Sequence, residues 1–182
     1  MRWLQAAFAL LLYCWLAFGA FMLAHLITPA EAKGTMATYR VSERGLAHIK
    51  HFEGLRLHSY FCAANVCTIG YGHTGPDVKP GMVITEARAE ELLRQDLAAA
   101  EKAVAALVKV PLRQGQADAL IDLIFNVGRD AIAKSTLLKL LNKGEYGKSA
   151  EQLMRWVHSG SAVVAGLQRR RLAARNMWLE RV

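Results

Sequence analysis

The longest uncharged stretch of the chain runs from Trp3 to Ile27 and is almost entirely hydrophobic. As a helix rising about 1.5 Å per residue it would be roughly 37 Å long, which exceeds the ~30 Å hydrocarbon core of a bilayer. Arg2 precedes this segment, whereas Glu31 and Lys33 follow it. Because positive charge is favoured on the cytoplasmic side, the pattern predicts a membrane-spanning helix with the rest of the chain outside.

Three interpretations of segment 1–27 are left open. Ala30-Glu31-Ala32 has the small-x-small form of a signal-peptide cleavage site, although the apolar run is longer than is usual for one. A permanent anchor is the second interpretation. The third is a weak anchor that can leave the bilayer, and the composition favours it, because Gln5, Gly19, His25 and six alanines dilute the larger apolar residues. All three export the domain that follows.

The remainder of the chain begins with a linker and a short helix. Residues 28–38 (TPAEAKGTMAT) are rich in small and turn-forming residues, so we expect the folded domain to span residues 39–182. Ser42 is a suitable N-cap for a first helix, in which apolar residues recur at helical spacing until Gly54.

The later pattern is mainly helical. Residues 55–72 have the strand-turn-strand pattern of one small hairpin. Further helices are predicted from Thr85 towards Val108 and at about 113–127, 135–141, 148–156 and 166–179. The whole predicts an α+β fold that is mainly helical, with one small β-hairpin near its start.

Composition and charge narrow the class of protein. A chain of 182 residues that is 53% hydrophobic and 21% charged can form one folded domain and is not a disordered tail. It has 23 Lys and Arg against 15 Asp and Glu, and only Arg2 lies in the first 30 residues, so the domain is itself basic. A basic surface suits nucleic acid, anionic lipid or an anionic wall polymer, and it is equally compatible with simple solvation.

Glu53 is the first candidate for acid chemistry. It is predicted to end the first helix, where unpaired carbonyl groups and the helix dipole disfavour a carboxylate and favour the protonated form. A protonated carboxyl group suits proton donation to a leaving glycosidic oxygen, and the apolar neighbour Phe52 acts in the same direction. A glutamate at a helix end is commonly just solvated, so Glu53 alone does not identify a site.

The spacing after Glu53 is more specific. Eight residues separate Glu53 from Cys62, five separate Cys62 from Thr68, and the run continues as Ile69-Gly70-Tyr71-Gly72-His73. This arrangement resembles the phage-type lysozymes of glycoside hydrolase family 24, whose motif is Glu, eight residues, Asp or Cys, five residues, Thr, and then a similar segment. The resemblance covers approximately residues 41–178 and continues through Gln116-Ala117-Asp118-Ala119-Leu120, Phe125-Asn126-Val127-Gly128, Ser135-Thr136-Leu137-Leu138 and Gly166-Leu167 with Arg170-Arg171.

The resemblance implies a muramidase that hydrolyses the β-1,4 bond between N-acetylmuramic acid and N-acetylglucosamine in peptidoglycan, for host cell lysis. It implies that Glu53 is the general acid, that Thr68 helps to hold the attacking water, and that Cys62 stands where many members have aspartate. Inversion at the anomeric carbon is implied as well. A thiol with the ordinary pKa of about 8.5 is mostly protonated at pH 7, so the part of Cys62 in water activation is left open.

Other residues are expected to support this site. The hairpin residues Gly70, Tyr71 and Gly72 are candidates for close backbone approach or substrate contact, and His73 for ordering the hairpin through a hydrogen bond. The resemblance implies that Arg170 or Arg171 pairs with Glu53, although a run of three arginines is equally typical of an exposed charged surface. No metal and no cofactor are expected, because the remaining histidines have no metal-ligand spacing with the cysteines: His25, His48, His51, His58 and His158.

Cys14, Cys62 and Cys67 are an odd number of cysteines, so one is left over if two pair. Cys62 and Cys67 flank the predicted hairpin turn, and directly opposed residues of a hairpin lie within the distance that a disulfide accepts. Such a bridge would block Cys62. If residues 3–27 leave the bilayer, Cys14 can attack the bridge, pair with Cys67 and release Cys62. We expect this exchange to act as a switch, resembling that of signal-arrest-release endolysins. The alternative is that Cys14 is merely a small apolar residue and that the hairpin cysteines stay reduced.

The predicted partners are peptidoglycan glycan strands and, through residues 3–27, the bacterial inner membrane. We expect no nucleic acid, a monomer, and a domain that is tethered in the periplasm and then released. A non-enzymatic basic protein that disrupts membrane or wall is the alternative from a different class, and lysis that survives Glu53→Gln would identify it. A bacterial autolysin or defence lysozyme would share the chemistry, so the sequence does not separate it from a phage protein.

Overall fold

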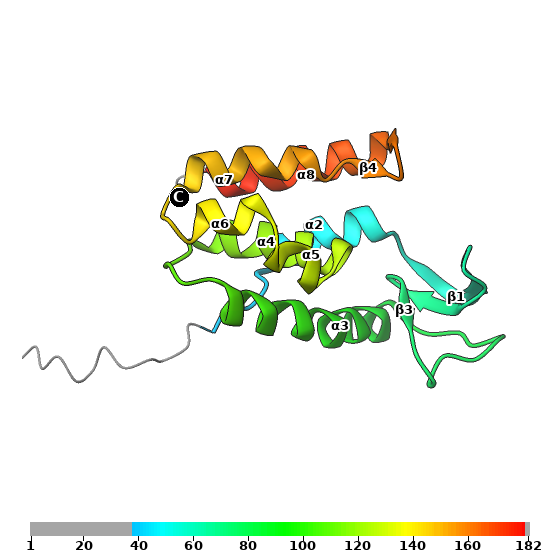
Figure 1. Ribbon diagram of the computed structural model, residues 1–182. Coiled ribbons are helices and arrows are strands. Elements are labelled where there is room, and N and C mark those ends of the chain that lie inside the picture. Colours follow the sequence, from blue (N-terminus) through cyan, green and yellow to red (C-terminus); the bar gives the residue numbers. More distant parts are fainter. Residues whose placement is uncertain (1–37, 181–182) are drawn as a thin grey trace, which may run out of the picture. The chain divides into compact units, whose positions relative to one another are not determined.

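The computed structural model describes residues 38–180, in which helices predominate (Figure 1). Segments 1–27 and 28–37 and the last two residues, with the predicted anchor and most of the predicted linker, lie outside the described residues. The elements in chain order are α2 (Glu43–Glu53), β1 (Arg56–Phe61), β2 (Cys67–Gly70), β3 (His73–Thr74), α3 (Glu86–Leu107), α4 (Gln114–Val127), α5 (Arg129–Ala133), α6 (Thr136–Leu141), α7 (Tyr146–Gln152), the 3-10 helix η2 (Leu153–Arg155), β4 (His158–Ser159), β5 (Ala162–Val163) and α8 (Ala165–Leu179).

Helix α2 has the bounds that the sequence predicts. The Ser42 hydroxyl caps its start by accepting a hydrogen bond from the Gly45 N–H at 3.1 Å. Gly54 ends the helix with a φ of +72°, a conformation that residues with a side chain rarely adopt. Leu46 and Ile49 are buried against the core, so the helix presents its other faces to charged partners and to solvent.

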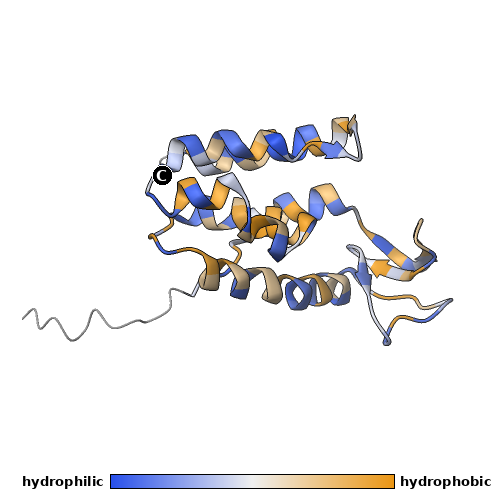
Figure 2. Cartoon of the chain, viewed as in Figure 1, coloured by the Kyte–Doolittle hydropathy of each residue, from blue (hydrophilic) through white to orange (hydrophobic). Residues whose placement is uncertain are grey.

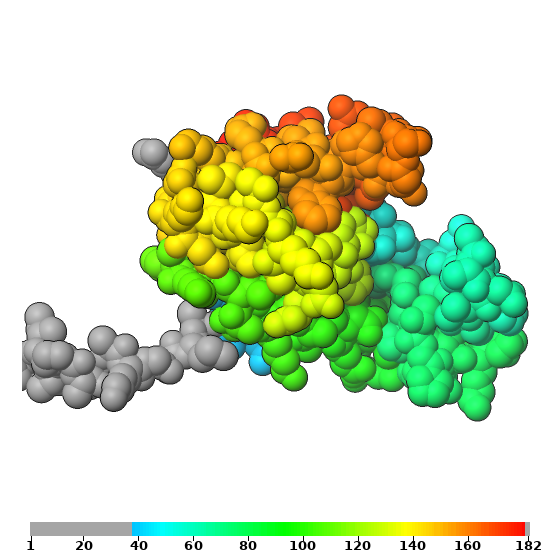
Figure 3. Space-filling model, viewed as in Figure 1, coloured from blue at the N-terminus to red at the C-terminus, as the bar shows by residue number. Residues whose placement is uncertain are grey.

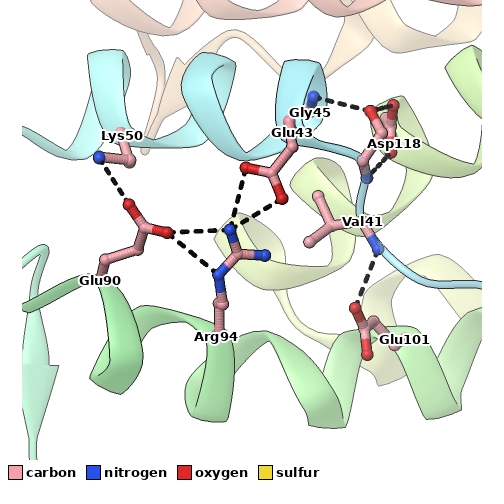
Figure 4. Close-up of polar contacts among 9 residues, drawn as sticks. Val41, Glu43, Gly45, Lys50, Glu90, Arg94, Glu101 and Asp118 are labelled. Carbon is pink, nitrogen blue, oxygen red and sulfur yellow. Dashed lines mark hydrogen bonds and ion pairs between the residues drawn. The ribbon is translucent and has the colours of Figure 1, made fainter. Parts of the chain in front are cut away.

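Two neighbouring helices hold α2 in place (Figure 4). From α4, the Asp118 carboxylate accepts hydrogen bonds from the backbone N–H and the hydroxyl of Ser42, at 2.9 and 2.5 Å. From α3, Glu90 pairs with Lys50 at 3.0 Å, and Arg94 pairs with Glu43 at 2.9 Å. The last residue of α2 therefore has a fixed position relative to the body of helices.

The sheet is larger than the single hairpin that the sequence predicts. Strands β1, β2 and β3 form an antiparallel sheet in that order, and Val83 adds an isolated bridge to His58. The β1–β2 hairpin lies where it is predicted, within residues 55–72. Strand β3 was missed because it has only two residues, too few for a period-two pattern to emerge.

A second hairpin, β4–β5, also contradicts the prediction of one hairpin only. Its strands have two residues each, and Gly160 provides the left-handed turn between them with a φ of +60°. No helix or strand was predicted between residues 156 and 166, because this segment has no alternation of apolar and polar residues long enough to indicate a strand.

Most predicted helices are confirmed, with three differences. Thr85 caps α3 through its hydroxyl, and Ser135 caps α6 in the same way. The helix predicted at 148–156 starts two residues earlier and ends as the 3-10 turn η2, and the five-residue helix α5 was not predicted. Helices of one or two turns take their stability from packing, so their own sequence says little about them.

Helix α4 is the centre of the core. It contributes the buried residues Leu120, Ile121 and Leu123, and it packs against α2, α3 and α8. Figure 2 shows hydrophobic residues concentrated on α4 and α6, whereas α8 and the start of α3 are largely hydrophilic. Gly115 permits the close approach of α4 to α8, since a Cβ atom there would lie 2.3 Å from the carbonyl oxygen of Met177.

Within residues 38–180, no helix has the length and apolar character needed to cross a bilayer.

Candidate active site

Glu53 is the last residue of α2, as the sequence predicts, and its side chain is 22% exposed. The next N–H, from Gly54, bonds back to the carbonyl oxygen of Lys50 at 3.1 Å and closes the helix. Figure 3 shows the surface indented where α2 ends, between the β1–β2 hairpin and the β4–β5 hairpin. At 22% exposure, the side chain of Glu53 is accessible from solvent.

Arg170 from α8 reaches Glu53. Its Nη1 atom lies 2.7 Å from Oε1 of Glu53, and its guanidinium group lies over the Phe52 ring, 5.9 Å from the centroid. Arg170 is therefore the cationic partner of Glu53, as the resemblance implied for one of the two arginines.

Arg171 does not contact Glu53. It points into the core, where its Nη1 lies 3.3 Å from Asp122 and its Nη2 donates to the Asn126 side-chain oxygen. The alternative interpretation of the arginine run as an exposed surface is wrong for both residues, since Arg170 is 4% and Arg171 0% exposed. Only Arg169 is exposed, because the helical turn directs consecutive residues to different sides of α8.

The backbone between β2 and β3 lies opposite Glu53. Gly72 has a φ of +91°, and a Cβ atom built there would lie 3.9 Å from Oε2 of Glu53. The preceding Gly70, with a φ of +66°, lies close to Ala89 of α3. Both glycines therefore occupy backbone conformations that residues with a side chain rarely adopt, and Gly72 brings the hairpin against the carboxyl group.

Thr68 lies on β2, paired with Tyr60 of β1 and with Thr74 of β3. It is 3% exposed, and its hydroxyl donates a hydrogen bond to the carbonyl oxygen of Val66 at 2.9 Å. A hydroxyl has one hydrogen but two acceptor lone pairs, so Thr68 retains the capacity to accept a hydrogen bond.

Cys62 follows the end of β1 and is half-buried with a free thiol. Hydrogen bonds from the backbone at Val66 and at Ala64, with a smaller contribution from Thr68, hold the pKa of the Cys62 thiol below its ordinary value. The Thr68 hydrogen serves either this thiolate or the Val66 carbonyl, not both. Cys62 thus has more thiolate character at neutral pH than an isolated cysteine.

The register of the hairpin differs from the expectation for the two cysteines. Cys67 pairs with Phe61, and the Cys62 N–H bonds to the carbonyl oxygen of Val66 at 3.0 Å. Cys62 and Cys67 are therefore one position away from direct opposition. The two cysteines are therefore not a directly opposed pair, contrary to the expectation from the sequence. Both are free thiols in the structure.

His73 on β3 links the sheet to α3. Its Nδ1 lies 2.9 Å from Asp96, and its Nε2 lies 3.2 Å from Asp77 in the following loop. Burial opposes the charged form of His73, but the two carboxylates outweigh it, so the pKa of His73 lies above its ordinary value. Tyr71 is buried, with the Lys50 ammonium 5.4 Å from its ring centroid.

Sequence reasoning missed Asp122 and His48, which lie behind Arg170. Asp122 is fully buried on α4, and its carboxylate contacts both arginines of α8. His48 of α2 approaches the same carboxylate at 3.5 Å. The sequence does contain a signal for Asp122. Asp118 and Asp122 are four residues apart in a predicted apolar helix, where a buried carboxylate requires a partner.

Across residues 38–180, no group of three or more His, Cys, Asp or Glu side chains is arranged to hold a metal ion.

Comparisons with known proteins agree with this geometry. The family described as phage lysozyme matches residues 50–174. An endolysin of Acyrthosiphon pisum secondary endosymbiont phage 1 is 42% identical over 142 residues, which cover 76% of this chain and 97% of that protein. A SAR-endolysin of Bacteriophage PS119 is 33% identical over 153 residues, which cover 84% of this chain and 92% of that protein.

The solved structures include a crystal structure of a P22 lysozyme variant. It matches with a TM-score of 0.74 and 40% sequence identity, covering 78% of this chain and 99% of that chain. The matched region contains the end of α2, the three-stranded sheet and the arginines of α8, which together surround Glu53. The chain therefore belongs to the phage lysozyme family, and it is a lysozyme related to the signal-arrest-release endolysins.

Proposed function

We propose that the protein is an endolysin that hydrolyses the β-1,4 bond between N-acetylmuramic acid and N-acetylglucosamine in peptidoglycan. The observation that carries the proposal is the position of Glu53. Its carboxyl group ends a helix, is accessible from solvent, pairs with Arg170 at 2.7 Å, and faces the backbone of Gly72. A carboxyl group so placed can donate a proton to the oxygen of a glycosidic bond lying across the hairpin.

In this proposal the residues of the β1–β2 hairpin position the attacking water. The phage lysozyme motif has Thr68 helping to hold the attacking water and Cys62 at the position where many relatives have aspartate. The spare acceptor capacity of Thr68 and the lowered pKa of the Cys62 thiol support this arrangement. Attack by water on the face opposite the leaving group inverts the anomeric carbon. No metal or cofactor takes part.

The test uses the full-length protein and purified peptidoglycan sacculi. Release of reducing ends is measured for the native chain, for Glu53→Gln and for Glu43→Gln. Glu43 provides a matched control, because it lies on the same helix, pairs with Arg94 and is 82% exposed. We expect the hydrolysis rate of Glu53→Gln to fall at least about 100-fold, the usual contribution of a general acid. Glu43→Gln should keep most of the native rate. Lysis of cells that survives Glu53→Gln would instead identify a non-enzymatic disruption of membrane or wall.

The proposal extends to the segment before the domain. Residues 3–27 would span the inner membrane as a signal-anchor, residues 28–38 would form a linker, and residues 39–182 would be the periplasmic domain, acting as a monomer once released. The apolar sequence and the likeness to proteins named SAR-endolysin support this assignment. Fractionation during lysis tests it. The intact chain should move from the membrane fraction to the soluble periplasmic fraction, and a shortened or permanently membrane-bound chain would contradict release.

We also propose that disulfide exchange controls activity. A Cys62–Cys67 bridge would hold the enzyme inactive. The Cys14 thiolate would then attack the Cys67 sulfur, forming a Cys14–Cys67 bond while Cys62 leaves as the thiolate, with no further oxidant. The odd number of cysteines and the lowered pKa of Cys62 support the exchange. In the structure Cys67 pairs with Phe61, and both hairpin thiols are free, as in the active form that the exchange would produce for Cys62. Unchanged timing of lysis in Cys14→Ser would contradict the switch.

A further inference from the structure

Four charged or titratable side chains from three helices meet behind Glu53. Asp122 of α4 is at the centre, Arg170 and Arg171 come from α8, and His48 comes from α2. The side chains of Asp122 and Arg171 are 1% and 0% exposed. Charged groups are almost never buried this far unless they are paired, so each charged member of the cluster depends on the others as partners.

Asp122 fixes the orientation of Arg170. Its Oδ1 atom accepts a hydrogen bond from Nε of Arg170 at 2.8 Å and lies 2.7 Å from Nη2 of the same group. The third nitrogen, Nη1, points to Glu53 at 2.7 Å. Because a guanidinium group is planar and rigid, holding the Nε and Nη2 edge sets the direction of Nη1.

The other carboxylate oxygen of Asp122 faces Arg171 and His48. Its Oδ2 atom lies 3.3 Å from Nη1 of Arg171 and 3.5 Å from Nε2 of His48. Burial lowers the pKa of Arg171 to about 10, so the group is still charged at neutral pH. Burial also opposes ionisation of Asp122, but His48 and Arg170 outweigh it and hold the pKa of Asp122 below its ordinary value.

The negative charge of Asp122 offsets part of the positive charge beside Glu53. Arg170 contacts Glu53 directly, the backbone of Gly72 faces it, and Arg171 and Asp122 lie behind Arg170, with His48 approaching Asp122. Without the negative charge of Asp122, two guanidinium groups would oppose one glutamate. Surplus positive charge beside a general acid favours loss of its proton, so removing the charge of Asp122 should change the pH at which activity falls.

We propose that Asp122 is a positioning residue for the hydrolysis, which holds Arg170 against Glu53 and offsets the charge of Arg171 beside that pair. The inference rests on the proposed function, in which Glu53 is the general acid. It assigns Asp122 no contact with the substrate.

The test measures the pH dependence of sacculus hydrolysis for native protein and Asp122→Asn. Asparagine has the same shape and can still accept from Nε of Arg170, but it carries no charge. We expect the alkaline limb, the pH above which activity falls, to move down by about one unit. At fixed pH above the limb, kcat should fall more than KM rises.

Asp118→Asn provides the matched control. Asp118 is also buried on α4, one helical turn earlier, and it binds Ser42 and Gln114 rather than the arginines of α8. This variant should lower the melting temperature without moving the alkaline limb. If Asp122→Asn likewise lowers only the melting temperature, Asp122 is structural and the proposal is overturned.

Two further variants separate charge from folding. Adding Arg171→Met to Asp122→Asn removes the surplus positive charge and should return the limb towards its native position. Arg171→Met alone should move the limb up, a measurement that stays available if Asp122→Asn does not fold. An unmoved limb in Arg171→Met would contradict the proposal. Full activity of Glu53→Gln would instead overturn the proposed function, so the two failures are distinguishable.

Discussion

Ser42 and Asp118, 76 residues apart in sequence, are joined by two hydrogen bonds at the start of α2. The Ser42 N–H and hydroxyl both donate to the Asp118 carboxylate, while the same hydroxyl accepts from Gly45. The helix that ends at Glu53 therefore starts from a fixed point on α4. Its register and direction are set eleven residues before the candidate catalytic carboxyl group.

Removing the Asp118 carboxylate should destabilise the fold. Asp118→Ala leaves the Ser42 N–H and the Gln114 amide without their acceptor in a site that is 2% exposed. We expect a loss of about 2–3 kcal/mol in the free energy of unfolding, measured by urea denaturation. Asp130→Ala, at a side chain that is 85% exposed, is the control and should change it by less than about 0.5 kcal/mol. Equal effects of the two would show that the Ser42 contacts contribute nothing.

Gly45 allows this contact to form. A Cβ atom at Gly45 would lie 2.6 Å from Cγ of Asp118, so Gly45→Ala should displace the carboxylate and cost about 1–3 kcal/mol. Gly147 in α7 is the matched control, since it is also helical and has no atom near its Cβ position. Alanine there should stabilise the protein by up to about 1 kcal/mol. Thermal unfolding should therefore give shifts of opposite sign, and a stabilised Gly45→Ala would refute the packing argument.

The His73 contacts should make stability depend on pH. The pKa of His73 is raised in the folded state by Asp96 and Asp77 against the effect of burial. The contribution of His73 to the free energy of unfolding is thus fully present below the unfolded pKa of about 6.5. It is lost as pH rises through the folded pKa of His73. The stability difference between native protein and His73→Gln should shrink across that window. His158→Gln, at an exposed position on β4, should change stability little at any pH tested.

The Cys62 thiol should react as an activated cysteine. Its lowered pKa, due mainly to the backbone at Val66 and Ala64, predicts that alkylation by iodoacetamide reaches half its maximal rate below about pH 8.5. The measurement uses a Cys14→Ser, Cys67→Ser chain, in which Cys62 is the remaining thiol. The same chain unfolded in urea is the control and should show a midpoint near the ordinary value. Identical midpoints in the two states would contradict the proposed hydrogen bonding.

The sequence by itself determined the elements that depend on local signals. Ser42 and Thr85 start helices because their hydroxyls cap exposed N–H groups, and Gly54 ends one because it tolerates a positive φ. The spacing of Glu53, Cys62 and Thr68 was sufficient to identify the family, since such spacing is set by a helix end and a hairpin next to each other. Two-residue strands and the single-turn helix α5 leave no such pattern.

Only the tertiary structure decided which charged groups meet. Nothing local distinguishes Arg170, which pairs with Glu53, from Arg171, which turns to Asp122, or from the exposed Arg169. The register that places Cys67 opposite Phe61 depends on the turn geometry, so a count of residues between cysteines missed it. Charge interactions act through space between helices that are distant in sequence, and their partners are fixed only when those helices pack.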